Sequence, residues 1–464
     1  ALTEGERYDQ WRQISRGEVR VVIGARSAVF APLRDLGFIV VDEEHDSSFK
    51  QDVGVRYNAR DLALVRGQRE GCTVVLGSAT PSLESYQRAM DGKGSYIELK
   101  KRPTGQALPS VEIIDMSDVD KGVDGQRPLL SPSLRVALES VVSEGEQAIL
   151  FLNRRGHSTS VICGQCGEPV NCPHCDVSLT YHRRHARLRC HYCDYSQDMP
   201  STCPSCESTE LMLRGAGTEK LVDKLSEELS DFRFLRLDRD TASGRGVQEI
   251  IEGFRSHRAD VLVGTQMVTK GHDFPRVTLV GVVLADTALR LPDFRSGERT
   301  FQILAQVAGR AGRGDSPGRV IVQTYLPRHQ SIIAAAQHDF ARFATFELEA
   351  RKEQGFPPFG YLIALRFEGP DIALVREVAS RYERAAQIAT TEFAGTEDRT
   401  LIVGPTEAPL AKLKDQHRWQ MLLRSKSRQA LRALTARVLS LAGYSRQEKG
   451  AVTVIVDVDP GNLL

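Results

Sequence analysis

The spacing of its cysteines constrains the fold of this 464-residue chain more than any other feature of the sequence. Two thiolates presented by one tight turn are a common way for a protein to hold a metal ion. Eight soft thiolates are enough for two closed tetrahedral sites, which predicts two structural Zn²⁺ ions rather than disulfides. Eight of the nine cysteines form four such Cys-x-x-Cys pairs: Cys163/Cys166, Cys172/Cys175, Cys190/Cys193 and Cys203/Cys206.

The distances between the pairs indicate how the cysteines combine. Fourteen residues separate Cys175 from Cys190, close to the spacing of two knuckles on one ribbon, whereas five residues separate Cys166 from Cys172. We therefore expect nested pairing, with the inner four cysteines in one site and the outer four in the other. Iron–sulfur ligation is the alternative, which the regular pairs disfavour. The ninth, Cys72, lies in an apolar run and is expected to be a buried thiol.

Composition and charge exclude several classes of protein. A hydrophobic content of 41% is sufficient for folded cores, and 61 basic against 60 acidic side chains leave a net charge of +1. A nucleic-acid site would therefore need local segregation of charge rather than overall attraction. The sequence has no apolar run long enough to cross a bilayer and no signal-peptide layout, so we expect a cytoplasmic protein that is not bound to a membrane.

Short runs of β-branched residues predict two sheets. Runs of continuous apolar character are typical of strands buried on both faces, hence of parallel sheets covered by helices. Helix-like segments separate several runs of the second set, as in a further α/β layer. The first set comprises residues 21–23, 38–41 and 73–76, and the second comprises residues 148–152, 234–237, 261–263, 279–284 and 320–322.

The cysteine cluster interrupts the second set, so it is an insertion after the first strand of that layer. Beyond it, a double proline, a helix candidate at residues 372–389 and strand candidates at 419–423 and 452–456 predict a small α+β domain. We expect an α/β protein with four parts. These are a first lobe at 1–104, a second lobe at 105–160 and 211–345, a zinc-binding insertion at 161–210, and a C-terminal domain at 346–464 that binds DNA or partners.

An acidic motif directly follows the run at residues 38–41. The sequence Asp42-Glu43-Glu44-His45 places two acidic groups at the carboxyl edge of a strand, where α/β proteins bind phosphates. In such a site Asp42 would hold Mg²⁺, usually through water, and Glu43 would orient and deprotonate the water that attacks a γ-phosphate. An ordinary acidic turn is the alternative interpretation.

Two further elements favour the nucleotide interpretation. The sequence Gly77-Ser78-Ala79-Thr80 ends the next strand, where its small hydroxyl side chains can bond the acidic motif. At residues 306–313, Arg310 and Arg313 are three residues apart, the spacing of one helix face. The rigid fork of arginine suits a γ-phosphate, because it donates to several oxygens at once. A solvated basic helix end is the alternative, but glycines within a helix require a reason such as close approach to a ligand.

In this order, the three elements resemble the Walker B element, motif III and motif VI of superfamily-2 helicases. Further segments and the eight-cysteine insertion resemble the PriA family of primosomal replication-restart helicases, over essentially the whole chain. The resemblance implies two RecA-like helicase lobes, the first of them truncated, and ATP with Mg²⁺ in addition to two Zn²⁺. The further segments are residues 23–28, 151–156, 264–267, 270–272 and 293–295.

The resemblance also implies roles for individual residues. Asp42, Glu43, Arg310 and Arg313 would be catalytic, and Asp42, Glu44, His45 and Gln306 would contact the nucleotide. Arg26, Phe49, Tyr57, Thr265, Gln266 and Lys270 would contact DNA. Aromatic side chains in the loop after the acidic motif could stack on bases, although packing against the lobe is equally compatible with the sequence.

The function implied is that of an ATP-dependent 3′–5′ DNA helicase of replication restart, which binds forked and single-stranded DNA and initiates primosome assembly. Single-stranded DNA-binding protein and other primosome proteins are the partners that the resemblance implies. The alternative is a non-enzymatic, zinc-containing scaffold that binds forks and recruits replication proteins. An RNA helicase is disfavoured, because the insertion matches a DNA-restart family.

The sequence departs from this pattern in one respect, since no segment matches the phosphate-binding motif G-x-x-x-x-G-K-[ST]. We expect that loop, a winged helix and an N-terminal DNA-binding domain to precede Ala1, and the chain alone to be inactive.

The insertion also contains a candidate contact for DNA. Between the inner cysteine pairs, a basic run at residues 183–189 suits phosphates, although such runs are usually solvated faces. We also expect the insertion to project from its lobe and to be dispensable for nucleotide chemistry.

Overall fold

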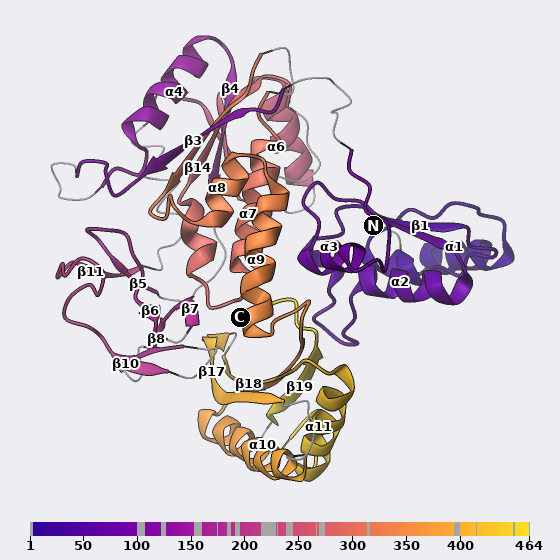
Figure 1. Ribbon diagram of the computed structural model, residues 1–464. Coiled ribbons are helices and arrows are strands. Elements are labelled where there is room, and N and C mark those ends of the chain that lie inside the picture. The colour runs from indigo at the N-terminus through magenta and orange to yellow at the C-terminus, as the bar shows by residue number, and fades with distance from the viewer. Residues whose placement is uncertain are drawn as a thin grey trace. The chain divides into compact units, whose positions relative to one another are not determined.

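The computed structural model divides into two units, Ala1–Tyr96 and Ile97–Leu464, which are described separately (Figure 1). Among the described residues, no helix combines the length and the apolar character needed to cross a membrane. The structure describes residues 3–99, 107–121, 127–152, 160–173, 175–182, 187–190, 195–214, 229, 231–237, 245–265, 267–268, 274–312, 316–393, 400–413, 415–448 and 451–463.

The first unit contains a two-stranded parallel sheet in which β1 and β2 are paired. Helix α2 packs closely on β2, because Gly67 has no side chain where a Cβ would lie 2.3 Å from Val74 Cγ2. Its elements are α1 (Glu4–Arg16), η1 (Arg26–Phe30), β1 (Phe38–Val41), η2 (Ser47–Phe49), α2 (Ala59–Glu70), β2 (Thr73–Leu76) and α3 (Leu83–Met90).

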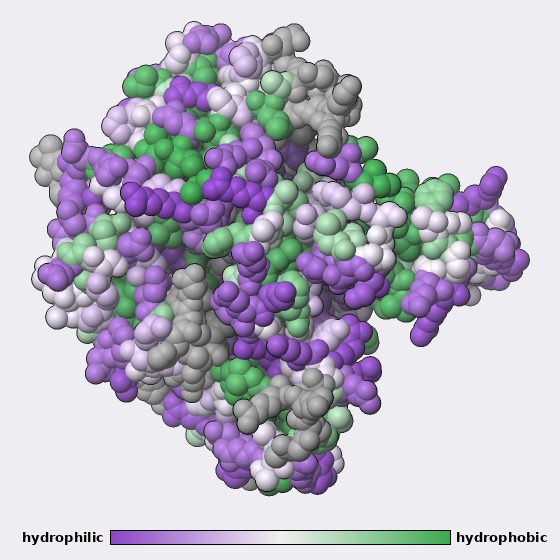
Figure 2. Space-filling model, in the orientation of Figure 1, coloured by the Kyte–Doolittle hydropathy of each residue, from purple (hydrophilic) through white to green (hydrophobic). Residues whose placement is uncertain are grey.

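Two expectations about this unit are wrong. Residues 21–23 form no strand, and the side chains of Val21 and Ile23 are 73% and 93% exposed. The strands are not buried on both faces either, since Phe38 and Val40 are exposed. Within the described residues, β1 pairs with one strand, and a helix covers one face of the sheet. The other face of these apolar strands is therefore left exposed. Hydrophobic surface is correspondingly visible over this unit at the right of Figure 2.

The second unit is built on a six-stranded, all-parallel sheet in the order β12-β13-β4-β14-β15-β3. All five predicted runs are strands of this sheet, and β4 and β13 are buried throughout, as their continuous apolar sequence predicts. Strand β3, at one edge, was not predicted. Its elements are β3 (Ser110–Asp115), α4 (Pro132–Ser143), β4 (Gln147–Leu152), β12 (Phe234–Leu237), α6 (Arg245–Arg255), β13 (Val261–Gly264), β14 (Val277–Val283), η3 (Ala285–Arg290), α7 (Ser296–Ala308), β15 (Arg319–Thr324), α8 (Gln330–Ala336) and α9 (Phe340–Gln354).

The cysteine-rich insertion lies in the chain between β4 and β12 and folds into a small antiparallel sheet of its own. Its five strands are ordered β10-β9-β8-β5-β11, beside a separate β6–β7 pair. Its elements are β5 (Ser160–Cys163), β6 (Asn171–Cys172), β7 (Cys175–Ser178), β8 (Thr180–His182), β9 (Arg187–Arg189), β10 (Ser196–Asp198) and β11 (Leu211–Arg214).

The C-terminal domain is the predicted α+β structure. An antiparallel sheet in the order β17-β18-β16-β19 is covered on one face by two helices, α10 and α11, whose core includes Phe367, Tyr382 and Met421. The helix and both strands predicted here are present, whereas β16 and β17 were missed. The elements are β16 (Tyr361–Gly369), α10 (Ile372–Glu392), β17 (Leu401–Leu413), β18 (Gln416–Ser425), α11 (Arg428–Leu441) and β19 (Thr453–Val458).

The insertion does not project from its lobe as predicted. One hydrophobic cluster contains Val161 and Leu188 of the insertion together with Leu362 and Leu422 of the C-terminal sheet. Phe294, which precedes α7, packs against the same cluster. The reason is that the second face of the C-terminal sheet carries apolar residues, and the insertion buries them.

Candidate nucleotide site and zinc centre

The acidic motif forms a tight turn at the carboxyl end of β1. Glu43 has a positive φ of 47°, and its N–H donates to Asp42 Oδ1 at 2.9 Å. The turn is bonded to the end of β2, because Gly77 N–H donates to Val41 O at 2.8 Å and Glu44 N–H donates to Gly77 O at 3.0 Å. Asp42 and Glu43 are exposed at this edge. The arrangement presents two carboxylates to a ligand in water, as Mg²⁺ binding through water requires.

Glu44 is buried behind the turn, with 2% of its surface exposed. Its carboxylate accepts from the N–H of Ser82 at 2.6 Å, from the hydroxyls of Ser82 and Ser85 at 3.0 and 2.9 Å, and from Arg60 Nη1 at 3.3 Å. Ser82 is also the N-cap residue of α3. Because all these contacts are internal, the geometry gives Glu44 a structural position.

His45 connects the acidic motif to the residues after β2. Its Nδ1 lies 2.7 Å from Ser78 Oγ, and the same hydroxyl accepts from the N–H of Thr80 at 2.9 Å. The expected bond between a small hydroxyl side chain and the acidic motif is therefore present. It joins the segments that follow two adjacent strands.

The loop after the acidic motif is held together by hydrogen bonds near its base. Arg26 Nη1 donates to the carbonyls of Ser48 at 3.0 Å and Lys50 at 2.8 Å, so this guanidinium holds the start of the loop. An isolated bridge pairs Lys50 with Asn58 at its base. At its tip, Val53 and Val55 are each 80% exposed.

Both aromatic residues expected to stack on bases are partly buried in this unit. Tyr57 packs edge-on against Phe30, with ring centroids 5.1 Å apart, and Phe49 lies half-buried in η2. The packing interpretation therefore describes Tyr57, and neither residue is as exposed as the valines at the tip. The exposed valines could not be singled out from the sequence, because turn and strand valines look alike there.

The arginine-containing segment does not continue the helix. Gln306 lies in the last turn of α7, which ends at Ala308, so Arg310 follows the helix and the predicted common helix face is wrong. Gly312 has a φ of +65°, and a Cβ there would lie 2.4 Å from Gly318 N. This glycine therefore serves a close approach of two backbone segments. Arg313, Gln266 and Lys270 lie outside the described residues, and Thr265 follows β13 directly.

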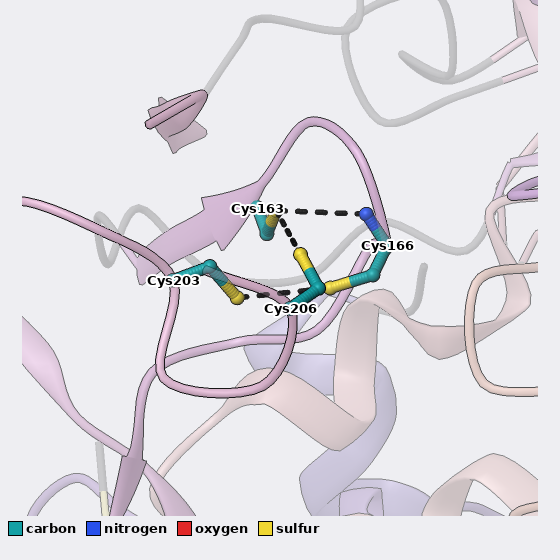
Figure 3. A group of neighbouring side chains, drawn as sticks. All are labelled: Cys163, Cys166, Cys203 and Cys206. Carbon is teal, nitrogen blue, oxygen red and sulfur yellow. Dashed lines mark hydrogen bonds between the residues drawn. The ribbon is translucent and has the colours of Figure 1, made fainter. Parts of the chain in front are cut away.

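The outer four cysteines converge on one point. Their Sγ atoms all lie within 4.8 Å of one another, with Cys163–Cys206 at 3.6 Å and Cys166–Cys203 at 3.7 Å (Figure 3). Zn–S bonds of about 2.3 Å in a tetrahedron require sulfur atoms roughly 3.8 Å apart, whereas a disulfide requires about 2.05 Å. These cysteines form a four-cysteine zinc site, in agreement with the nested pairing.

Each half of this site is a tight turn that preorganises its sulfur ligands. Gly167 and Glu207 follow the two pairs with φ of +77° and +61°, and their N–H groups donate to the carbonyls of Cys163 and Cys203. Burial raises the pKa of the Cys163 thiol, but the amides of Cys166 and Gln165 outweigh burial and bring it to about 7. Burial raises the pKa of the neighbouring Cys166 thiol, so the zinc assignment rests on the positions of the four sulfur atoms.

The inner cysteines are described in part. Cys172 and Cys190 are buried in the cluster shared with the C-terminal sheet, whereas Cys193 and the side chain of Cys175 lie outside the described residues. Part of the basic run, residues 183–186, also lies outside them. Arg187 makes a cross-strand ion pair with Asp198 at 3.1 Å, which is typical of a solvated face. Cys72 is half-buried rather than buried.

Three stretches of the second unit match models of known protein families. Residues 203–315 match the helicase conserved C-terminal domain. Residues 172–197 match the PriA DNA helicase Cys-rich region (CRR) domain, and residues 352–461 match the primosomal protein N C-terminal domain. The six-stranded parallel sheet with its cysteine-rich insertion is therefore a helicase lobe of the α/β, RecA-like class.

Relatives of the whole chain define the family. Replication restart protein PriA of Bacillus subtilis (strain 168) is 45% identical over 99% of this chain and 56% of its own length. The PriA proteins of Synechocystis sp. and Treponema pallidum (strain Nichols) are 42% and 38% identical, over 99% and 100% of this chain and 55% and 68% of their own lengths. The chain belongs to the PriA family of replication restart proteins, and it spans 55 to 68% of the length of these three relatives.

Among solved structures, RecG bound to a three-way DNA junction aligns with 75% of this chain and 35% of its own chain at 16% identity. The TM-score of this alignment is 0.39.

Proposed function

We propose that the protein of which these residues form part is an ATP-dependent 3′–5′ DNA helicase that restarts replication at forks. The observation that carries the proposal is the turn after β1, where Asp42 and Glu43 are exposed together at the carboxyl edge of the β1–β2 sheet. Membership of the PriA family supplies the DNA-restart context.

The residue roles proposed for hydrolysis are supported by the exposed turn after β1 for Asp42 and Glu43, and by family membership for the others. Asp42 holds the metal ion, and Glu43 orients and deprotonates water. Gln306 contacts the nucleotide, and Arg310 and Arg313 stabilise charge on the phosphates. When bound, ATP with Mg²⁺ supplies the phosphoryl group and the charge that these side chains act on. His45, whose Nδ1 contacts Ser78 Oγ, is a proposed nucleotide contact, as is Glu44.

Forked and single-stranded DNA are the proposed substrates. Thr265, which lies at the carboxyl end of β13, is a proposed DNA contact together with Gln266 and Lys270. The loop anchored by Arg26 is a second contact, at which Val53 and Val55 offer exposed apolar surface. Single-stranded DNA-binding protein and other primosome proteins are the proposed partners.

A second Zn²⁺ bound by the inner cysteines also belongs to the proposal. Its support is the match of residues 172–197 to the Cys-rich region and the burial of Cys172 and Cys190.

The division of the chain into four parts is likewise a proposal. The parts are 1–104, 105–160 with 211–345, 161–210 and 346–464, and the last is a C-terminal domain that binds DNA or partners.

The test is the substitution Glu43→Gln in the whole protein. Glutamine keeps the shape but cannot act as a base, so ATP hydrolysis should fall by at least roughly 10²-fold, with ATP and DNA binding retained. Glu18→Gln, at an exposed residue paired with Arg16, is the matched control and should hydrolyse ATP normally. Normal turnover in the Glu43 variant would exclude Glu43 as the base, and a wild-type whole protein that binds forks without hydrolysing ATP would establish the scaffold alternative.

A further inference from the structure

The first zinc-binding turn is held by side chains that come from the helicase lobe. Its four consecutive backbone carbonyls, from Gly164 to Gly167, each accept a hydrogen bond from such a side chain. Arg127 donates to Gly164 O through Nη1 and to Gln165 O through Nη2, the latter at 3.0 Å. Ser117 Oγ donates to Cys166 O at 3.1 Å, and Arg290 Nη1 donates to Gly167 O at 3.0 Å.

The side chains that contact this turn follow three adjacent strands of the large sheet. Ser117 and Arg127 follow β3, and Arg290 closes η3, directly after β14. Tyr325 follows β15, and its ring packs so closely on Gly167 that a Cβ there would lie 2.4 Å from the ring. Strands β14, β15 and β3 are neighbours in the sheet. The zinc-binding turn therefore covers the carboxyl ends of half the sheet.

Arg127 differs from the other donors in the number of bonds it makes. Besides the two carbonyls of the turn, its guanidinium donates to Ser117 O at 2.8 Å and to Val119 O at 3.2 Å. A planar guanidinium can serve four carbonyls from two segments at once, which an ammonium group cannot do in fixed geometry. Arg127 thus ties the turn to the segment after β3.

The charge of Arg127 is also suited to this place. Zn²⁺ with four thiolates carries a net charge of −2, which a nearby cation stabilises. Arg290 is already paired with the buried carboxylate of Asp286. Within the described part of the chain, no carboxylate lies at ion-pair distance from Arg127. The pKa of neighbouring Glu168 is raised by burial, against the effect of Arg290.

We propose that Arg127 is a positioning residue of the outer zinc site, which holds the Cys163–Cys166 turn in its ligating conformation without touching the metal. The outer zinc site is consequently a joint product of the insertion and the helicase lobe. Residues that orient metal ligands from behind typically change metal affinity by about 10- to 100-fold when they are removed. This inference does not depend on the proposed function.

The experiment compares Arg127→Ala and Arg127→Lys in the 464-residue chain, with Arg187→Ala as the control. Arg187 is an arginine of the insertion, in a surface ion pair with Asp198. Zinc retention is measured against a graded chelator, and alkylation of each cysteine is followed by mass spectrometry. Binding of Co²⁺ in place of zinc reports on the tetrahedral thiolate geometry through its absorption.

Both Arg127 variants should lose zinc from the outer site at roughly 10- to 100-fold lower chelator concentration, with a weakened Co²⁺ spectrum. Cys163, Cys166, Cys203 and Cys206 should then be alkylated faster, while Cys172 and Cys190 keep the wild-type rate and the control is unchanged. Wild-type retention in both variants would overturn the proposal, as would full rescue by lysine, since charge alone would then be sufficient. If the alanine variant unfolds, so that all the cysteines react together, the lysine variant decides the outcome.

Discussion

The four residues of the acidic motif serve different purposes because consecutive side chains leave the turn in different directions. Asp42 and Glu43 are exposed, Glu44 is buried against the N-terminus of α3, and His45 contacts Ser78. A buried carboxylate that accepts several hydrogen bonds is an anchor, because each donor would otherwise be left without a partner. Glu44 therefore fixes the two exposed carboxylates relative to α3.

Asp293 is a second buried carboxylate, in the segment before α7. It accepts from Arg299 Nη1 at 2.7 Å, from the N–H of Arg295 at 3.0 Å and from the N–H of Leu463 at 3.3 Å. Burial raises the pKa of Asp293, but the charges of Arg299 and Arg295 outweigh burial, so the pKa is lowered. The ionised form is thus favoured in the folded protein.

A pH dependence of stability follows from Asp293. Since its folded pKa lies below the unfolded value of about 3.9, its contribution is complete above that value and is lost as the pH falls through the folded pKa. Asp293→Asn should lower the free energy of unfolding at neutral pH and make it decline less steeply on acidification below about pH 4. Denaturant unfolding at a series of pH values measures both effects. Parallel pH curves for the two proteins would show that Asp293 does not contribute in this way.

At the scale of elements, the two glycines after α7 occupy positions that differ in whether they require glycine. Gly309 has φ −63° and ψ −3°, and a Cβ there would meet only backbone oxygens at 3.4 and 3.5 Å. Gly312 has a positive φ, and a Cβ there would collide with the backbone of Gly318. An alanine is therefore compatible with the fold at the first position and strained at the second.

The matched pair Gly309→Ala and Gly312→Ala tests this difference. Gly312→Ala should lower the free energy of unfolding by about 1–3 kcal/mol, because a residue with a Cβ is forced into a left-handed conformation. Gly309→Ala should change it by less than about 0.5 kcal/mol. Urea denaturation of both variants provides the comparison. Equal destabilisation would mean that residues 309–312 behave as a single strained turn.

The position of a strand in its sheet explains part of what could be predicted. Central parallel strands such as β4 and β14 were predictable, because burial on both faces demands a continuous apolar run. Position does not explain every outcome, since the edge strands β12 and β19 were predicted and the central antiparallel strand β16 was missed. Strand β17 contains Pro405 and Pro409, which argue against a strand, but an edge strand tolerates proline. Residues 21–23 were wrongly predicted to be a strand, because β-branched residues favour an extended backbone but do not by themselves provide a neighbouring strand to pair with.

The same limit applies to the sites. The cysteine ligands were predictable, because a Cys-x-x-Cys spacing is itself the geometry of a metal-binding turn. The contacts of Arg127 were not, because they go to backbone carbonyls, which every sequence has. The bond between Ser82 and Glu44 was not predictable either, because it depends on tertiary structure.

At the scale of the whole second unit, a short segment after β19 connects three parts of the chain. Arg295 donates to Pro460 O at 3.1 Å, Arg299 donates to Gly461 O, and Arg366 donates to Asn462 O at 2.8 Å. The first two arginines belong to the helicase lobe, and the third belongs to β16. Residues 460–463 therefore link the C-terminal domain to the segment that begins α7.

Leu463 contributes to the same link through its buried side chain. Its side chain is 1% exposed, in the cluster formed by the insertion and the second face of the C-terminal sheet, where Phe294 of the helicase lobe also packs. The core that closes the C-terminal domain itself, around Tyr382 and α10, does not include it. Loss of the Leu463 side chain should therefore loosen the junction while the domain keeps its own core.

Leu463→Ala is accordingly expected to lower the free energy of unfolding by about 2–5 kcal/mol, the usual cost of a cavity at a buried leucine. Leu413→Ala, at an exposed leucine of the same domain, should cost less than about 0.5 kcal/mol. Hydrogen exchange locates the effect: amides of residues 293–299 and of β16 should exchange faster in the Leu463 variant, and those of α10 should not. If α10 were deprotected to the same extent, Leu463 would be part of the domain's own core, and the junction between the insertion, the helicase lobe and the C-terminal domain would have to be maintained by Phe294 and its neighbours instead.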